Sequence, residues 1–99
     1  MGLVFYTKKG SIISTVDLPT TEIIEPEITG SGKSVIDGNS KKAKKQAPNL
    51  IFDITKTPLS REEIMGQINS VYRSGRRGIK TVIVKDGDEI LYVVQPKAK

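Results

Sequence analysis

Apolar and polar positions alternate in short blocks at the start of the chain. Residues 3–6 and 12–16 are apolar, β-branched or aromatic, which is typical of strands. The Lys-Lys-Gly sequence at residues 8–10 lies between them and predicts a hairpin turn. Two antiparallel strands are therefore expected in this part of the chain.

The next part of the chain is more polar and has weaker strand signals. Residues 22–28 predict a third strand, but Pro26 restricts it to a sheet edge or a break because proline has no amide proton to donate. About residues 29–47 are rich in Gly, Ser, Asn and Lys. They predict a long, mobile, basic loop that a short strand over residues 34–36 interrupts.

The pattern changes in the second half of the chain, where a helix signal follows a strand signal. Residues 50–55 predict an apolar strand. Ser60 is suited to cap a helix, and Glu63, three residues on, completes a capping box. Apolar residues then recur at helical spacing, at Ile64, Ile68, Val71 and Tyr72. We expect one main helix over about residues 60–74, with Gly75 as its C-cap.

Strand signals return after this helix. Residues 79–84 are β-branched, Asp86-Gly87 predicts a two-residue hairpin turn, and residues 89–94 predict the returning strand. A right-handed crossover through the helix would place the strands on either side of it parallel in one sheet. The other strands should be antiparallel. The predicted class is α+β, with a mixed sheet and a strand-helix-strand unit.

Composition narrows the classes of function. The 99 residues are enough for one domain, over residues 1–99, and the net charge of +5 favours acidic or polyanionic partners. The chain has no cysteine, so it has no disulfide and no thiolate metal site. It also has no histidine, which excludes histidine-based acid–base catalysis. No apolar run approaches the about 20 residues of a membrane helix, and no signal peptide is recognisable.

One carboxylate stands inside the apolar strand over residues 50–55. A strand of this kind is usually buried on both faces, and a buried carboxylate is costly unless it is paired, hydrogen-bonded or bound to a metal. Asp53 is therefore a candidate nuclease carboxylate. The plainer interpretation is that Asp53 lies at the open end of the strand and caps a turn.

The sequence TGSGKS at residues 29–34 is similar to a phosphate-binding loop. The Walker pattern needs a glycine where Glu27 stands, a core strand before the loop and a helix after it. Pro26 precedes this loop and Asp37-Gly38 soon follows it. The context favours a flexible Gly-Ser loop over a nucleotide triphosphatase.

Basic residues gather in two places. One is a lysine cluster, which is either a solvated surface or a set of phosphate contacts: Lys41, Lys42, Lys44 and Lys45, with Lys33 upstream. The other is at the end of the predicted helix, where Arg73, Arg76 and Arg77 complement the helix dipole or bind phosphate.

Four features follow one another along the chain: a lysine-rich stretch, PNLIFDIT at residues 48–55, a capped helix, and GIKTVIV at residues 78–84. This order resembles the C-terminal nuclease domains of contact-dependent growth inhibition toxins, over about residues 41–94. The resemblance implies a restriction-endonuclease-like or related small RNase fold. In that pattern one acid precedes the central strand. A second acid and a lysine, two residues apart on the strand, then hold a divalent metal and position the attacking water.

Asp53 matches the strand acid of that family. The chain departs from the pattern where the family has Pro-Asp, because it has Pro48-Asn49. It also has Thr55 in place of the lysine, and Lys56 falls on the opposite face of the strand.

Two versions of the chemistry follow. In one, Asp37 or Glu27 supplies the second acid and the cofactor is Mg²⁺, bound by oxygen ligands. In the other no metal is needed, since the 2′-hydroxyl of RNA is the nucleophile and Lys, Arg, Thr and Tyr side chains position it and stabilise charge.

The leading interpretation is an antibacterial toxin domain that cleaves RNA, with transfer RNA as the favoured substrate. The catalytic candidates are Asp53, Thr55, Lys56, Arg76 and Arg77, and the RNA-binding candidates are Lys33 and the lysine cluster. The resemblance implies a cognate immunity protein, a translation elongation factor as a further partner, delivery from a cell surface within a larger protein, and action in the target cytoplasm. The alternative is a non-enzymatic module that binds nucleic acid or protein.

Overall fold

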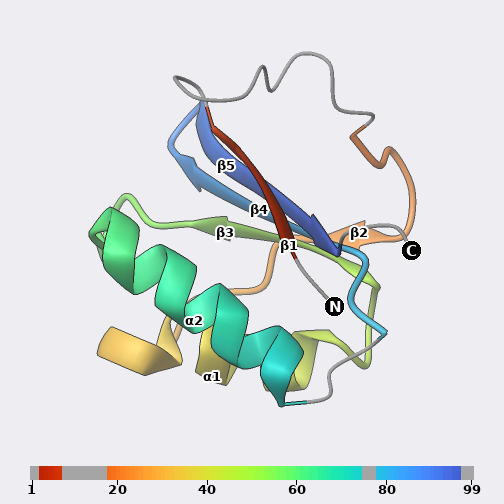
Figure 1. Cartoon of the computed structure of the whole chain (residues 1–99), viewed down its shortest axis with the longest axis horizontal. Coiled ribbons are helices and arrows are strands. Elements are labelled where there is room, and N and C mark those ends of the chain that lie inside the picture. The colour runs from red at the N-terminus through yellow and green to blue at the C-terminus, as the bar shows by residue number, and fades with distance from the viewer. Residues whose placement is uncertain (1–2, 8–17, 75–77, 97–99) are drawn as a thin grey trace.

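The computed structural model describes residues 3–7, 18–74 and 78–96 of the chain (Figure 1). Their strands form a five-stranded sheet in the order β1-β5-β4-β3-β2. The strands are β1 (Leu3–Thr7), β2 (Ile23–Ile24), β3 (Asn49–Asp53), β4 (Thr81–Asp86) and β5 (Glu89–Pro96). Strands β2, β3 and β4 are parallel to one another, and β5 runs antiparallel to both β4 and β1.

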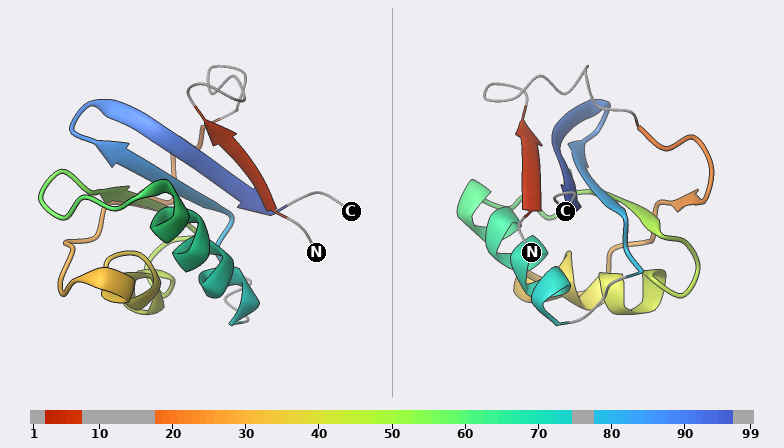
Figure 2. Two further views of the ribbon diagram at one scale, coloured as in Figure 1. Left: turned by 60° about the vertical axis from the view of Figure 1, so that its left-hand side comes forward. Right: turned by 45° about the vertical axis from the view of Figure 1, so that its right-hand side comes forward.

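Two α-helices and a short 3-10 helix lie on one face of this sheet, as the views in Figures 1 and 2 show. The helices are η2 (Gly32–Ser34), α1 (Asp37–Ala43) and α2 (Arg61–Arg73). Helix α2 connects β3 to β4, and the two strands pair in parallel from Asn49 with Thr81 to Asp53 with Lys85. The predicted strand-helix-strand unit and the α+β class with a mixed sheet are confirmed.

The core lies between the sheet and the helices. Alternate residues of β3 and β4 point toward the helices and are fully buried: Leu50, Phe52, Val82 and Val84. Helix α2 contributes its apolar stripe of Ile64, Ile68 and Val71, and Ile36 and Ala43 come from the chain at and within α1. Each of these side chains except the smaller one of Ala43 contributes about 1.5–3 kcal/mol by leaving water.

Helix α2 begins as the sequence predicts. The hydroxyl of Ser60 accepts a hydrogen bond from the amide of Glu63 at 3.1 Å, and the Glu63 carboxylate accepts one from the amide of Ser60 at 2.9 Å. This is the predicted capping box. The β4–β5 hairpin also forms, with Gly87 at a φ of +62° in its turn.

Two expectations about the polar middle of the chain were wrong. Residues 29–47 are not one loop, because η2 and α1 form within them. The strand expected over residues 34–36 does not form, and these residues run from the end of η2 to the start of α1. The side chain of Asn39 explains part of this order. Its amide donates to the carbonyls of Thr29 and Val35, each at 3.0 Å, and its oxygen accepts from Thr29. Val35, Ile36 and Ala43 then anchor the segment in the core.

Two further details differ from the prediction. The third strand shrinks to β2, two residues before Glu25 and Pro26, and it pairs in parallel with β3 rather than antiparallel. Strand β3 ends at Asp53 instead of residue 55, since Asp53 itself bonds to the turn that follows. The expected strand over residues 12–16, its turn at residues 8–10 and the C-cap Gly75 lie outside the described residues.

Candidate functional site

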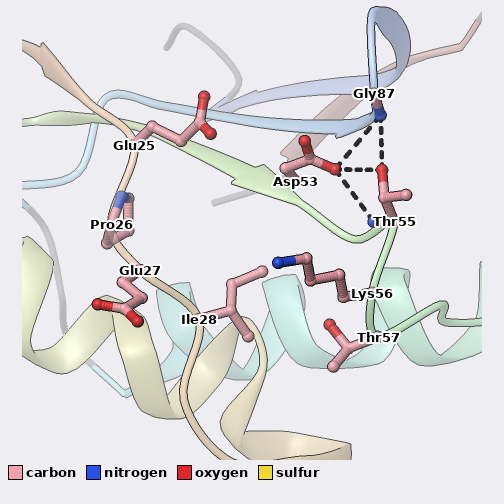
Figure 3. A pocket seen from close by; sticks show the side chains of 9 residues that line it. All are labelled: Glu25, Pro26, Glu27, Ile28, Asp53, Thr55, Lys56, Thr57 and Gly87. Atoms are coloured by element: carbon pink, nitrogen blue, oxygen red, sulfur yellow. Dashed lines mark hydrogen bonds between the residues drawn. The ribbon is translucent and has the colours of Figure 1, made fainter.

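A cleft of about 620 Å³ opens where the parallel strands end (Figure 3). One wall follows β2 (Glu25, Pro26, Glu27 and Ile28), one is the end of β3 and its following turn (Asp53, Thr55, Lys56 and Thr57), and Gly87 comes from the turn after β4. The carboxyl ends of parallel strands are where open α/β sheets commonly bind ligands. The sheet thus brings three separate segments of chain to one site.

Asp53 is held at this cleft through one of its two oxygens. Its Oδ1 accepts hydrogen bonds from the Thr55 amide at 3.0 Å, the Thr55 hydroxyl at 2.6 Å and the Gly87 amide at 3.3 Å. Asp53 is half-buried and caps the turn after β3, as the plainer interpretation expected. Its Oδ2 has no hydrogen-bond partner among the described residues, so a ligand in the cleft can still reach that oxygen.

The hydrogen bonds also set the charge of Asp53. The hydroxyl and amide of Thr55, then the amide of Gly87 and the positive charge of Lys85, lower the pKa of Asp53 from its ordinary value. Asp53 is therefore ionised at neutral pH, as a general base must be, but its lowered pKa makes it a weaker base than an ordinary aspartate.

An ion pair lies beside Asp53. Lys85 is the β4 neighbour of Asp53, and its ammonium contacts the Glu25 carboxylate at 3.0 Å. The bond to Glu25, with added attraction from Asp53 and Asp88, raises the pKa of Lys85 against the opposing effect of partial burial. Lys85 joins the segment after β2 to the end of β4, which holds the cleft wall in place.

The two candidate second acids lie in different places. Glu27 lines the cleft with Asp53, whereas Asp37 begins α1 and accepts a hydrogen bond from the Ser70 hydroxyl at 3.0 Å. Within the part of the chain that the structure describes, no three Asp, Glu, His or Cys side chains gather as metal ligands would.

Of the remaining predicted site residues, some lie at the cleft and others lie away from it. Lys56 lines the cleft, and Figure 3 shows its side chain extending toward the Glu25–Ile28 segment. The lysine cluster is exposed at the end of α1 and just after it, before β3 begins. A strand rises about 3.3 Å per residue, so the length of β3 separates the lysine cluster from Asp53. Arg76 and Arg77 lie outside the described residues.

Two sequence features have structural roles that the sequence did not reveal. The Asn49 amide donates to the carbonyl of Glu22 at 3.0 Å, and Glu22 has a φ of +51°, which is strained for this residue type. An aspartate could not donate this bond. In the TGSGKS sequence, a Cβ on Gly30 would lie 2.7 Å from the Ser34 Cβ, so this glycine permits a tight turn and is no sign of a phosphate loop.

Sequence reasoning also missed Glu25 and Gly87 as cleft residues. The signal is topological in both cases. A parallel β2 places Glu25 at the same edge as Asp53, and the parallel pairing of β3 with β4 places the turn after β4, with Gly87, at that edge.

The family comparison covers this whole site. The model for the contact-dependent growth inhibition CdiA C-terminal domain matches residues 19–90, which run from before β2 to the start of β5. The chain belongs to this family. Membership indicates an antibacterial toxin domain, which is part of a larger protein delivered from a cell surface and usually pairs with a cognate immunity protein.

Comparison with curated proteins and with solved structures finds no match. Among the described residues, no helix has the length and apolar character that a membrane span requires.

Proposed function

We propose that this toxin domain is a ribonuclease, with transfer RNA as its favoured substrate. The observation that carries the proposal is the cleft at the ends of β2, β3 and β4. It gathers an ionised carboxylate, Asp53, a hydroxyl bonded to that carboxylate, Thr55, and a cation, Lys56. A base, a group that orients it and a positive charge are what RNA cleavage through its own 2′-hydroxyl needs.

In the proposed reaction, Asp53 takes the proton of a ribose 2′-hydroxyl. The 2′-oxygen attacks the adjacent phosphorus, and the bond from phosphorus to the 5′-oxygen breaks. The products are a cyclic phosphate and a 5′-hydroxyl, whose proton comes from water in the open cleft. Lys56 stabilises the charge that develops on the phosphoryl oxygens. Thr55 is better placed to orient Asp53 than to contact RNA.

We favour the version without a metal. Asp53 Oδ1 already accepts three hydrogen bonds, Asp37 is held at α1, and Lys56 provides a positive charge in the cleft. In the Mg²⁺ version Asp53 and Glu27 would be the ligands, with water and RNA phosphate completing the shell. Cleavage that continues in excess EDTA supports the first version, and cleavage that stops and returns with Mg²⁺ supports the second.

The partners of the proposed enzyme follow from its chemistry and family. RNA is the substrate, and the cognate immunity protein is expected to block cleavage. A translation elongation factor is a further proposed partner, and the cytoplasm of the target bacterium is the proposed place of action.

The competing proposal is a toxin domain that binds nucleic acid or protein without cleaving it. It is favoured by one observation, which is that the hydrogen bonds of Asp53 are those of a turn cap. Inducible expression of the domain in bacteria separates the two proposals. The ribonuclease should arrest growth and produce discrete RNA fragments on a gel of total RNA. Asp53→Asn, which keeps the shape and loses the charge, should do neither. Growth arrest with intact RNA in both strains would favour the binding module.

A further inference from the structure

A second groove, of about 400 Å³, runs along helix α2 on the side that faces η2. Five of its residues lie on one face of α2 and the sixth comes from η2: Glu63, Gly66, Gln67, Ser70, Arg73 and Lys33. The positions on α2 follow helical spacing over ten residues, or about 15 Å. Of these residues, only Arg73 and Lys33 were expected from the sequence to bind phosphate or RNA.

The wall of this groove is held rigidly by Gln67, which is 6% exposed. Its oxygen accepts hydrogen bonds from the amides of Ile36 at 2.9 Å and Asp37 at 3.3 Å, and its amide donates to the carbonyl of Gly32 at 2.8 Å. These bonds fasten η2 and the start of α1 to α2. Lys33 is therefore carried by a segment with a fixed position, which favours a preformed site.

Gly66 has no structural reason to be glycine. It is exposed in the middle of α2, its φ lies in the ordinary range, and a Cβ built on it would meet nothing within 4 Å. Glycine inside a helix is less favourable than alanine. The one property that glycine adds here is access to the backbone, since the groove has no side chain at that point. Close approach of a ligand is a usual reason for such a position.

The charged side chains that line the groove favour an anion away from its start, where two cations outweigh the nearby Asp37 carboxylate that accepts a hydrogen bond from the Ser70 hydroxyl at 3.0 Å. Glu63 lies at the first turn of α2, where its carboxylate is engaged by the capping box. Lys33 lies beside Gln67 through the bond to Gly32, and Arg73 ends the helix six residues, or about 9 Å, further on. Both cations are exposed, so each can contact a ligand phosphate.

We propose that this groove binds a second part of the RNA backbone, with Lys33 and Arg73 contacting its phosphates and Gly66 allowing the chain to lie close to the helix. This inference rests on the proposed function, since it assigns the same RNA a second contact. The chain itself links the two sites, because the wall of the cleft ends at Ile28 and η2 begins at Gly32. An RNA strand leaving the cleft along this segment would reach the groove.

The test measures RNA binding in an Asp53→Asn background, so that the labelled transfer RNA stays intact. Lys33→Gln and Arg73→Gln should each flatten the slope of log affinity against log salt by about one unit, as expected for one lost phosphate contact. Lys80→Gln is the matched control, because Lys80 is exposed and lines neither the cleft nor the groove, and it should leave the slope unchanged.

Gly66→Ala supplies a second measurement that does not depend on charge. It should raise the melting temperature by about 4 °C or more, because alanine favours the helix, and weaken RNA binding at the same time. Stability and binding would then move in opposite directions, which no general loss of structure can produce.

The outcomes separate the groove from the ribonuclease. If the parent cleaves RNA while all three groove variants bind it as the background does, the groove proposal is wrong and the ribonuclease stands. If the three variants lose affinity for the cognate immunity protein instead, the groove is a protein interface and the proposal is also wrong. If the parent neither binds nor cleaves RNA, both proposals are wrong.

Discussion

At the scale of single residues, the hydroxyl of Thr55 lies near two carboxylates but has only one proton to donate. It lies 2.6 Å from Asp53 Oδ1 and 2.9 Å from Asp86 Oδ1, and it accepts the Gly87 amide at 2.8 Å. One proton can serve only one carboxylate at a time. The shorter distance indicates that the proton points to Asp53. Thr55 therefore positions the proposed base.

Replacing Thr55 tests this role. Thr55→Val keeps the shape but removes the hydroxyl, so Asp53 loses its shortest hydrogen bond, and RNA cleavage should fall by about tenfold or more, mainly in kcat. Thr55→Ser keeps the hydroxyl and should retain most of the rate. Steady-state kinetics of the two variants give the comparison. A rate retained in Thr55→Val but lost in Thr55→Ser would mean that the threonine methyl group, and not the hydroxyl, is what matters.

The pH dependence of Asp53 gives a second residue-scale prediction. Its folded pKa lies below the ordinary 3.8, so the charged carboxylate stabilises the folded state above that pH, and this contribution is lost as the pH falls through the folded pKa. Asp53→Asn has no such group. The difference in unfolding free energy between parent and variant should be constant near neutral pH and change only below about pH 4. Denaturant unfolding at several pH values measures it, and a change centred near pH 6 would contradict the lowered pKa.

Asn49 stands where the resemblance in the sequence leads us to expect an acid, and the two explanations for it predict opposite results. If Asn49 serves to hold the strained Glu22, replacing it with aspartate removes a partly buried hydrogen bond. Asn49→Asp should lower the free energy of unfolding by about 1–3 kcal/mol. If the variant is as stable as the parent and gains Mg²⁺-dependent cleavage, then position 49 belongs to a metal site.

At the scale of elements, α1 shows why a lysine-rich segment is hard to predict. Its exposed face carries lysines and its sequence begins with Asp-Gly-Asn-Ser, all of which favour loops. What orders it lies elsewhere in the sequence: Gln67 on α2 accepts the amides at its start, and Asn39 binds back to Thr29. Helix α2, by contrast, carries its own cap and apolar stripe, and its bounds were predicted to within one residue.

The lysine cluster gives the prediction at this scale. Replacing Lys41, Lys42, Lys44 and Lys45 with Gln should change the free energy of unfolding by less than about 0.5 kcal/mol, since all four are exposed. If they contact RNA, the salt slope should flatten by about two to four units. An unchanged slope would show that the cluster does not touch RNA. An acidic immunity protein would then be the better partner, and its association rate should lose its salt dependence in the variant.

At the scale of the whole molecule, the sheet topology decides what the site contains. The sequence predicted the parallel pairing of β3 with β4, and so the place of Asp53, because a helix signal lay between two strand signals. It predicted a strand that includes β2, but not that only two residues form it or that they pair in parallel with β3, because that pairing depends on residues far apart in the sequence. Glu25 and Glu27 enter the cleft for that reason, and Gly87 enters it from the turn after β4. The lysine cluster, adjacent to β3 in sequence, lies at the other end of the strand in space.

The most direct test of the central claim is to incubate the purified domain with purified transfer RNA and to map the ends of any fragments. The account predicts cleavage at discrete positions that continues in excess EDTA, leaves cyclic phosphate and 5′-hydroxyl ends, and is lost in Asp53→Asn. Intact transfer RNA after incubation with a domain that still arrests bacterial growth when expressed would contradict it.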